Sequence, residues 1–468
     1  MSFCAASDLL TAQRRAFAAG APDYDARIKA LDTLRDALRA HQEDFVAAMA
    51  DDFGGRAREE TLLLELLPLR EEIRNARRHL RRWMRPRAVR PTWFLLPARA
   101  RVMYQPLGVV GVIGAWNYQL LLTLSPLVGA LAAGNHVTVK PSEITPRTAD
   151  LVARLLAERF PTTYVAAVTG GPDVAAAFAA LPFDHLVFTG STRVGKLVMR
   201  AASEHLTPVT LELGGKSPAI VHADAPLERA VERIVMGKLY NAGQTCVAPD
   251  YALVPRPLLG TFRAAAERFV AERFPRLVDT RDYTRIVNAA HWERLAAYVD
   301  EARARGVAVH EVNPAGETCT VENRVLPPTL LVDPPDDLAV MREEIFGPLL
   351  PLVPYDALDD AIAYVNARPR PLALYYFDDD RDRIARVLDR TVSGGVTVND
   401  VVYHLGQDNL PFGGVGPSGT GHYHGFDGFE RFSKKKGVML QSRLSALKLV
   451  RPPYTSRTRA IIDRLLRL

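Results

Sequence analysis

The sequence has 468 residues, of which 48% are hydrophobic and 24% charged, with a formal net charge of +6. These values are typical of a soluble globular protein and exclude a disordered chain, a collagen-like fibre and a small disulfide-stabilised scaffold. At roughly 150 residues per domain, the length leaves room for about three domains. The charge excess is small for this length, so charge gives no argument for nucleic-acid binding.

Three cysteines, Cys4, Cys246 and Cys319, lie far apart in the sequence. So few and scattered thiols predict a reducing, cytoplasmic environment and not a disulfide framework. The first residues lack a basic segment followed by an apolar one, and glycines interrupt the longest apolar stretches. We therefore expect no signal peptide and no membrane-spanning helix.

The first ninety residues are predicted to be helical, because apolar residues such as Leu31, Leu34 and Leu38 recur at helical spacing. Residues 64–90 of this region are crowded with arginine. Such a run is compatible with an anion or nucleic-acid patch, but no aromatic residues are interleaved as a stacking platform. A solvated helix face is the favoured interpretation.

After Pro106 the pattern changes to alternating strands and helices. The predicted strands are Val109–Ile113, His136–Lys140, Tyr164–Val168, His185–Thr189, Val209–Glu212, Pro218–Val221 and Tyr251–Val254. The predicted helices between them are Leu120–Ala133, Arg147–Phe160, Val174–Ala180 and Val194–Glu204. This alternation predicts an α/β protein with two Rossmann-like parallel-sheet domains in series.

The C-terminal segment 452–468 is basic and amphipathic. A membrane-surface helix would have this pattern. Docking of the segment onto its own domain, or across a subunit interface, is the favoured interpretation.

Two strand ends carry residues suited to a nucleotide. Gly190, Ser191 and Gly195 follow one strand and open a helix, whose N-terminus favours phosphate. Their spacing is not the G-x-G-x-x-G dinucleotide pattern, so on its own it is weak support. Lys140 and Glu143 follow another strand, where a carboxylate can bind ribose hydroxyls, although a surface ion pair explains them equally well.

Cys246 lies in the glycine-containing segment NAGQTC and is a candidate nucleophile. A buried, inert cysteine is the more common case, but the polar surroundings are unusual for a protein core. Asn117 follows a predicted buried strand and supplies an amide for an oxyanion, and Glu212 ends another strand and supplies a base. The sequence does not show whether the three side chains converge.

Seven segments occur in the order and spacing of the aldehyde dehydrogenase superfamily: AWNY, KPSE, FTGSTRVG, LELGGKSP, NAGQTC, EEIFGP and LPFGGVGPSGTG. The resemblance runs from about Arg27 to Arg443. The stretches HLTPVTLELGGKSP and LPFGGVGPSGTGHYHGFDGFERFS resemble the class 3 branch, and the whole resembles bacterial coniferyl aldehyde dehydrogenases.

The resemblance implies a role for each matching residue. Cys246 would be the nucleophile, Asn117 the oxyanion donor, and Glu212 the base. NAD would be the cofactor, with NADP possible. The residues expected to hold it are Trp116, Lys140, Glu143, Gly190, Ser191, Gly195, Glu344 and Phe346. Glu344 is a second candidate base, so the division of labour between Glu212 and Glu344 stays open, and we expect no metal site.

Two departures from the family pattern precede the predicted helix. Ala115 stands where the family usually has proline, and Gln119 replaces a second proline. The apolar side chains of Tyr118, Leu121 and Leu122 are expected to line the substrate entrance. Gln119 could donate a hydrogen bond to a phenolic or methoxy oxygen of the substrate, although a solvent-exposed glutamine is at least as good an interpretation.

The resemblance also implies a domain division and an assembly. The NAD-binding domain would comprise residues 1–92 and 105–211, and the catalytic domain 212–398. A small β oligomerisation element would comprise 93–104 and 420–448, with a hairpin around Trp93–Tyr104, followed by a tail at 449–468. We expect a homodimer that acts on a small aldehyde.

Two other functions remain at this point. A CoA-acylating or phosphorylating relative would keep Cys246 and pass the acyl group to another acceptor, whereas Glu212 favours water. A catalytically silent NAD-binding protein would be expected to lose Cys246, Asn117 or Glu212, and all three are present.

Overall fold

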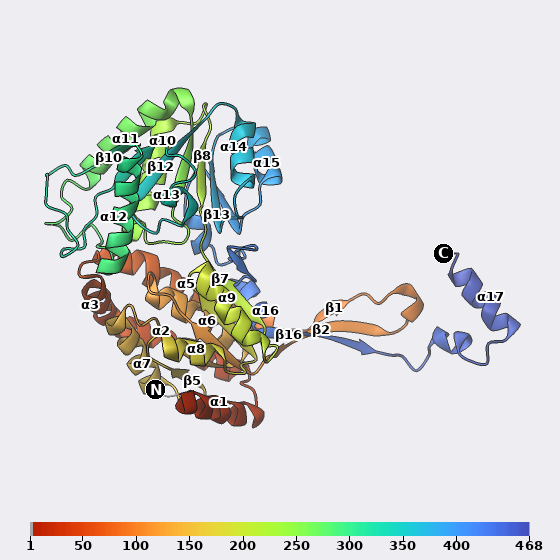
Figure 1. The fold of residues 1–468 in the computed structure, drawn as a ribbon. Helices are drawn as coiled ribbons and strands as arrows, with labels where there is room; N and C mark the ends of the chain where they lie inside the picture. Colours follow the sequence, from red (N-terminus) through yellow and green to blue (C-terminus); the bar gives the residue numbers. More distant parts are fainter. Residues whose placement is uncertain (1–2, 468) are drawn as a thin grey trace.

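The computed structural model describes residues 3–467. Two α/β units lie one above the other, and a thin β arm extends from the lower unit and ends beside the C-terminal helix (Figure 1). This confirms the predicted fold class: two parallel-sheet units and a small β element.

The lower unit contains a six-stranded sheet in the order β15-β7-β6-β3-β4-β5, parallel except for β15. Its strands are β3 (Val109–Ile113), β4 (His136–Lys140), β5 (Val165–Ala167), β6 (His185–Thr189), β7 (Val209–Glu212) and β15 (Gly419–Thr420). Its helices are α1 (Phe3–Ala18), α2 (Tyr24–Ala40), α3 (Gln42–Phe53), α4 (Arg58–Thr61), η1 (Leu62–Leu66), α5 (Leu67–Trp83), α6 (Gln119–Ala133), α7 (Pro146–Arg159), α8 (Pro172–Ala179), α9 (Thr192–Ser203) and α16 (Gly425–Arg431).

The helix α6 is the centre of this unit, because all fifteen of its residues are buried. It packs with β3 and β4, whose residues are also buried, and with the apolar faces of α2 and α5. A helix that is hydrophobic all round is stable only when its neighbours cover it on every side. The strand β3 and the start of α6 are therefore held rigidly, and the polypeptide between them is 114–118.

The upper unit contains a seven-stranded sheet in the order β10-β11-β12-β9-β8-β13-β14, parallel except for β10. Its strands are β8 (Pro218–Val221), β9 (Tyr251–Pro255), β10 (Ala308–Glu311), β11 (Thr329–Val332), β12 (Leu349–Tyr355), β13 (Ala373–Phe377) and β14 (Gly395–Val398). Its helices are α10 (Leu227–Leu239), η3 (Tyr240–Gly243), η4 (Arg256–Leu258), α11 (Leu259–Arg273), α12 (Ala289–Ala304), α13 (Ala339–Arg342), α14 (Leu358–Asn366), α15 (Arg381–Arg390) and η5 (Tyr403–Gly406).

The arm is a three-stranded antiparallel sheet in the order β1-β2-β16, formed by β1 (Arg87–Val89), β2 (Arg99–Pro106) and β16 (Ser433–Leu440). The expected hairpin is present, but its first strand lies before residue 93, and Trp93–Leu95 forms the short helix η2 inside the loop. Pro91 and Pro97 flank this loop, and proline cannot donate to a strand ladder. Of the segment 420–448, only β16 joins the arm, whereas α16 packs against α5 and α6.

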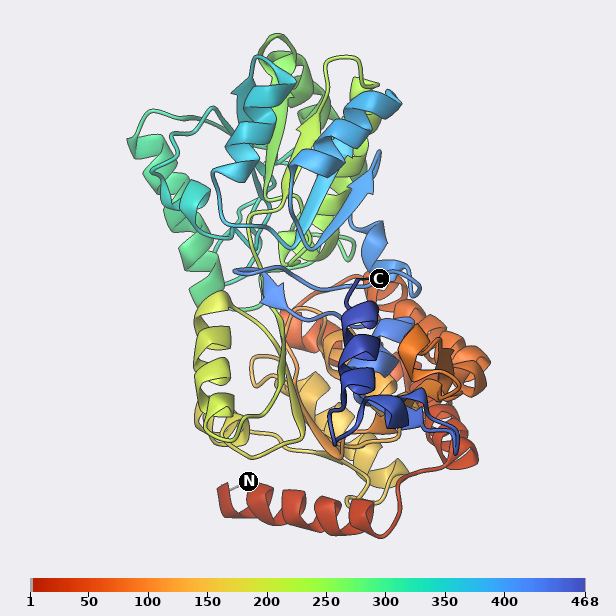
Figure 2. The same ribbon diagram turned by 90° about the vertical axis from the view of Figure 1, so that its right-hand side faces the viewer.

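The chain ends in η6 (Ala446–Val450) and α17 (Ser456–Leu465), which lie at the far end of the arm (Figure 1) and in front of the rest of the molecule in the turned view (Figure 2). Within residues 3–467, no helix is both long enough and apolar enough to cross a membrane.

Candidate active site

A cavity of about 850 Å³ lies between the two α/β units. Ten of the eleven residues predicted from the sequence line it: Trp116, Asn117, Lys140, Glu143, Gly190, Ser191, Glu212, Cys246, Glu344 and Phe346. They come from segments more than 200 residues apart in the sequence, so the fold brings together what the sequence leaves scattered.

Parallel strands explain this convergence. Asn117, Lys140, Gly190 and Glu212 follow or end β3, β4, β6 and β7, whose carboxyl ends lie at one edge of the sheet. The chain runs from β3 outward to β4 and β5, and then returns to β6 on the other side of β3. Open α/β sheets bind ligands in the crevice at such a reversal of strand order.

At one end of the cavity, which we call the β4/β6 end, the polar groups are Lys140, Glu143, Gly190 and Ser191. The Lys140 ammonium is buried and donates to Glu143 at 2.9 Å and to the Pro141 carbonyl at 3.1 Å, whereas Glu143 is partly exposed. This pairing uses only one carboxylate oxygen of Glu143, which lines the cavity, so the other oxygen can accept hydrogen bonds from hydroxyl groups.

The start of α9 suits an anion at the same end. Ser191 is the N-cap and accepts a hydrogen bond from the Val194 N–H at 3.3 Å, and the first turn contains no acidic residue. The buried Thr189 hydroxyl at the end of β6 has no partner among the described residues. These groups and the helix dipole fit a pyrophosphate.

Gly195 is the one predicted residue that does not line the cavity. A Cβ atom at this position would lie 2.6 Å from the Leu213 side chain. A glycine here allows close packing of α9 against the segment after β7, and the expected contact of Gly195 with the pyrophosphate stays a prediction.

At the other end, which we call the cysteine end, Cys246 follows a strained turn. Asn241, Ala242 and Gly243 all have positive φ angles, at 53°, 51° and 76°. A Cβ atom on Gly243 would lie 2.1 Å from the Gly347 carbonyl, so glycine is required there by both conformation and space. Such strain persists only where surrounding contacts fix the backbone.

Hydrogen bonds from distant segments fix this turn. The Asn117 amide donates to the Gln244 carbonyl at 3.1 Å, and the Asn241 amide donates to the Asn117 carbonyl at 3.0 Å. The Gln244 side-chain amide donates to the Asn241 carbonyl at 2.9 Å and to the Arg285 carbonyl at 3.0 Å. The loop after β3 and the cysteine turn are therefore bound to each other reciprocally.

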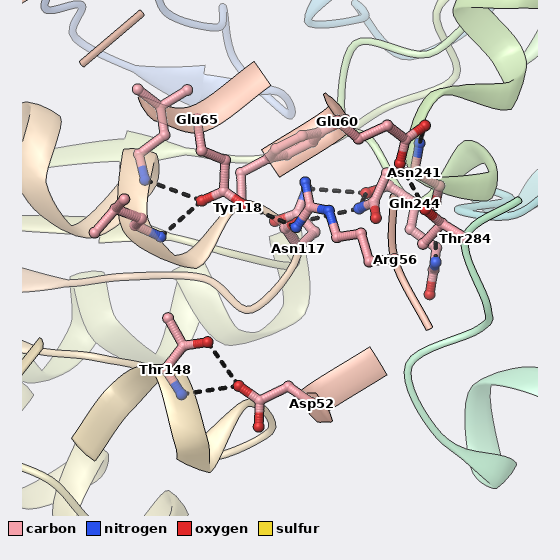
Figure 3. A network of polar contacts seen from close by, with 12 residues as sticks. Asp52, Arg56, Glu60, Glu65, Asn117, Tyr118, Thr148, Asn241, Gln244 and Thr284 are labelled. Carbon is pink, nitrogen blue, oxygen red and sulfur yellow. Dashed lines mark hydrogen bonds and ion pairs between the residues drawn. The ribbon is translucent and has the colours of Figure 1, made fainter. Parts of the chain in front are cut away.

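A buried ion pair supports the Asn117 side of this arrangement (Figure 3). Arg56 and Glu65 have fully buried side chains 2.7 Å apart. Glu65 also accepts from the Leu120 N–H at 2.8 Å, which caps α6 in place of a side chain at Tyr118. Arg56 lies against the Tyr118 ring and donates to the Asn117 carbonyl at 3.4 Å.

Glu60 supports the cysteine side of the same network. It accepts from the Asn241 N–H at 3.1 Å and from the Thr284 hydroxyl at 2.5 Å (Figure 3). A role for Arg56, Glu60 or Glu65 was not predicted, because their segment has only the sequence pattern of an ordinary amphipathic helix.

Burial controls the ionisation of the reactive groups. Together with the nearby carboxyls of Glu344 and Glu212, it raises the pKa of the Cys246 thiol to about 12. Burial also raises the pKa of Glu212 well above its ordinary value, and both of its oxygens lack a hydrogen-bond partner among the described residues. Burial and Asp250 raise the pKa of Glu344 to about 8. The cysteine end therefore holds a protonated thiol and two carboxyl groups with raised pKa values, of which Glu344 can exchange a proton near neutral pH.

Aromatic rings form one wall of the cysteine end. The Trp116 ring lies 5.3 Å from Phe346 and 4.9 Å from His291 between centroids. Burial lowers the pKa of His291 to about 4, so its ring is neutral at physiological pH. Arg294, one turn later in α12, brings a positive charge to the same wall. The position of His291 and Arg294 at the cavity was not predicted, because the sequence of α12 contains no functional motif.

The structure corrects the predicted substrate entrance. Gln119 is buried, accepts from the Ser142 N–H at 3.2 Å, and donates to the Ser142 carbonyl at 3.2 Å. It therefore ties α6 to the loop after β4 and is not available to a phenolic oxygen, so that prediction is wrong. Tyr118 donates to or accepts from the Thr245 hydroxyl at 2.7 Å, and of the three apolar residues only Leu122 lines the cavity.

Residues 6–438 match the model of the aldehyde dehydrogenase family. A probable coniferyl aldehyde dehydrogenase from Pseudomonas aeruginosa is 51% identical, over 98% of this chain and 95% of the relative. The coniferyl aldehyde dehydrogenase of Pseudomonas sp. strain HR199 is 46% identical, over 96% and 93%.

Solved structures agree with these relatives. Staphylococcus aureus AldH in a substrate-bound state superposes with a TM-score of 0.92 at 37% identity, over 98% of this chain and 99% of that one. A Mycobacterium tuberculosis aldehyde dehydrogenase complexed with NAD+ gives a TM-score of 0.84 at 28% identity, over 94% and 92%. The chain belongs to the aldehyde dehydrogenase family.

Proposed function

We propose that the protein oxidises an aldehyde to the carboxylic acid, with NAD as the hydride acceptor and Cys246 as the nucleophile. The observation that carries the proposal is the meeting of Cys246, Asn117, Glu212 and Glu344 at one end of a single cavity. A thiol, an amide donor and buried carboxyls are what a thioester route needs.

The thiol must lose its proton before it attacks, because the thiolate is the nucleophile. The raised pKa of Cys246 means that a neighbouring carboxylate has to accept this proton. The thiolate then adds to the aldehyde carbon and forms a thiohemiacetal. The amide of Asn117, oriented by its bond to the Gln244 carbonyl, and the backbone N–H of Cys246 stabilise the oxygen that gains charge.

NAD, when bound, supplies the acceptor for the hydride that leaves the thiohemiacetal carbon. The Cys246 thioester that remains is cleaved by water, and a carboxylate takes the proton from this water. Glu212 and Glu344 both line the cavity, both have raised pKa values, and both stay candidates for this base.

The cavity supports an extended cofactor in one orientation. Lys140 and Glu143 would hold the adenosine ribose, and Gly190 and Ser191 the pyrophosphate. Glu344, Phe346 and Trp116 would hold the nicotinamide half at the cysteine end. On this basis residues 1–92 and 105–211, which form most of the lower unit, are the NAD-binding domain, and residues 212–398, which form most of the upper unit, are the catalytic domain.

A simple assay tests the reaction. The purified protein is incubated with NAD and an aldehyde, NADH is followed by absorbance, and the product is identified by chromatography. We expect free acid without added CoA or phosphate. Acyl-CoA or acyl phosphate as the sole product would favour the acyl-transferring alternative, and no NADH with any aldehyde would contradict the proposal.

The substrate is proposed to be an aromatic aldehyde such as coniferaldehyde, or a medium-chain aliphatic one. Support comes from the relatives, two of which are named as coniferyl aldehyde dehydrogenases. Apolar side chains that line the cavity include Leu122, Leu372 and Phe412, and they favour an apolar substrate by about 25 cal/mol for each Å² removed from water. Comparing kcat/KM for coniferaldehyde, benzaldehyde, hexanal and acetaldehyde tests this, and a preference for acetaldehyde would contradict it.

We also propose a homodimer in the cytoplasm. The end of the arm exposes Trp93, Phe94 and Leu96, and the tail exposes Leu444 and Leu466, a set of large apolar residues that a second copy would cover. Cys246 and Cys319 are free thiols, in keeping with a reducing compartment. Light scattering tests the dimer, and removal of residues 441–468 tests whether the tail contributes to it or to weak contact with anionic vesicles.

A further inference from the structure

Next to the cavity lies a buried cluster of charges that the reaction does not use. It consists of Lys216, Lys238 and Asp250, whose side chains are 10%, 2% and 5% exposed. Buried charges cost free energy unless they are paired, so a cluster of three calls for an explanation.

Lys216 and Asp250 bind the segment that carries Glu344 from two sides. Lys216 donates to the carboxylate of Asp250, to the Val340 carbonyl at 2.8 Å and to the Glu343 carbonyl at 3.0 Å. Asp250 in turn accepts from the Ile345 N–H at 3.1 Å. The residues before and after Glu344 are therefore both fixed to the cluster.

The same cluster also fixes the glycine backbone that contacts the Glu344 carboxylate. Gly214 and Gly215 directly precede Lys216, and a Cβ atom on Gly214 would lie 1.9 Å from a Glu344 oxygen. The Gly215 N–H donates to the Glu344 carboxylate and so opposes the rise of its pKa. A small displacement of either segment would consequently move the carboxylate, or leave it without this donor.

Lys238 completes the cluster from α10. Its buried ammonium lies 3.9 Å from Asp250 and has no hydrogen-bond partner among the described residues. Two ammonium groups thus face the one carboxylate of Asp250. Burial lowers the pKa of Lys238 to about 8, and the negative charges of Asp250 and Glu344 oppose this shift.

We infer that Lys216 and Asp250 are positioning residues that hold the Glu344–Phe346 turn, and with it the nicotinamide half of the cofactor, in register with Cys246. The inference rests on the proposed function and extends it to two residues that do not touch the reacting atoms. This role explains the position of Lys216, which directly follows the glycine turn in the chain and donates hydrogen bonds to the segment that carries Glu344.

The test compares Lys216→Met, Lys216→Arg and the wild type with NAD and the best aldehyde substrate. Misplacement of a reacting group by about 1 Å can cost on the order of 100-fold in rate, so we expect kcat of Lys216→Met to fall roughly 10- to 100-fold. The dissociation constant of NAD should change much less, because the β4/β6 end is untouched. Lys216→Arg keeps the donors and should restore part of kcat.

A kinetic isotope effect separates positioning from a general structural defect. If hydride transfer has become slow, an aldehyde deuterated at the carbonyl carbon should lower kcat of Lys216→Met more than that of the wild type. Arg256→Met is the matched control, since Arg256 forms an exposed pair with Asp356 far from the cavity and should leave kcat and the isotope effect unchanged.

The outcomes are distinguishable. A folded Lys216→Met enzyme with wild-type kcat and isotope effect overturns the inference while the proposed function stands. If Lys216→Met does not fold, Asp250→Asn, which nearly preserves volume, is measured in the same way with the same criteria. Absence of turnover by the wild type contradicts the proposed function and the inference together.

Discussion

The two ends of the cavity are built in different ways. At the β4/β6 end the polar contacts are local: Lys140 pairs with Glu143, and Ser191 caps Val194, each three residues apart. At the cysteine end the contacts join segments more than 100 residues apart, such as Asn117 with Gln244 and Asn241 with Glu60. Local contacts survive small movements of the domains, whereas the cysteine end depends on the whole fold.

This difference predicts different consequences of substitution. Changes at the β4/β6 end should alter cofactor affinity and little else. Changes at the cysteine end should alter the chemical step or the stability of the fold.

Replacing the nucleophile should have the largest effect on activity. Cys246→Ala should abolish NADH formation and leave NAD binding nearly intact. In the proposed mechanism the thiolate would make the covalent bond to the substrate, whereas the β4/β6 end would hold the adenosine ribose and pyrophosphate of NAD. Steady-state assays and calorimetry with NAD measure the two quantities. Substantial turnover by the purified variant would remove the basis of the assignment.

Breaking the buried ion pair should have the largest effect on stability. Glu65→Gln leaves Arg56 charged without its partner, which typically costs about 3–5 kcal/mol of unfolding free energy. Urea denaturation measures the change. Asp356→Asn, in the exposed pair with Arg256, is the control and should leave the midpoint unchanged. A loss no larger than that of the control would mean that the network does not hold the site.

Asn117→Ala should slow the chemical step by roughly 100-fold or more, as expected for one oxyanion donor. The reason is that its amide, held by the Gln244 carbonyl two residues before Cys246, would donate to the oxygen that gains charge. The variant should lose kcat, with a smaller change in KM. An effect on KM alone, with kcat unchanged, would contradict the oxyanion role.

Glu344 should make stability depend on pH. Its pKa is raised from 4.5 to about 8 in the folded protein, so between these values the folded state keeps a proton that the unfolded state has released. Its contribution to stability is therefore complete below 4.5 and is lost as the pH rises through about 8. Denaturation of the wild type and Glu344→Gln at several pH values should show their difference changing across this window, and a constant difference would argue against the raised pKa.

The smallest effect is expected at Glu143. Its carboxylate would repel the additional phosphate of NADP, by about 1 kcal/mol at a solvated site, so Glu143→Gln should raise the kcat/KM ratio for NADP over NAD by roughly tenfold or less. The rate with saturating NAD should stay close to that of the wild type. A large loss of kcat would mean that this end takes part in the chemical step.

The sequence predicted most of the β4/β6 end because its signals are local. Strand ends, a proline after Lys140 and an N-cap at Ser191 all lie within a few residues of the groups they position, and the helices α6 to α9 agree with the predicted ranges within two residues. The predicted residues of the cysteine end came from sequence motifs. That their side chains lie together could be seen only in the three-dimensional structure.

The failures have a common physical cause. Gln119 was considered as a hydrogen-bond donor to the substrate. In the structure its side-chain amide is hydrogen-bonded to the backbone of Ser142, in the loop after β4. Arg56, Glu60, Lys216 and Asp250 act through partners distant in the sequence, and no periodicity or spacing marks such pairs. The hairpin of the arm was displaced because its strands were assigned to a segment that prolines interrupt.

The most direct test of the central claim is mass spectrometry of the enzyme quenched in acid during turnover. The account predicts an acyl group bound as a thioester to the peptide that contains Cys246, formed only when both NAD and the aldehyde are present. Cys319, which lies outside the cavity, should stay unmodified under the same conditions. An active enzyme without this adduct on Cys246, or with equal acylation of Cys319, would contradict the account.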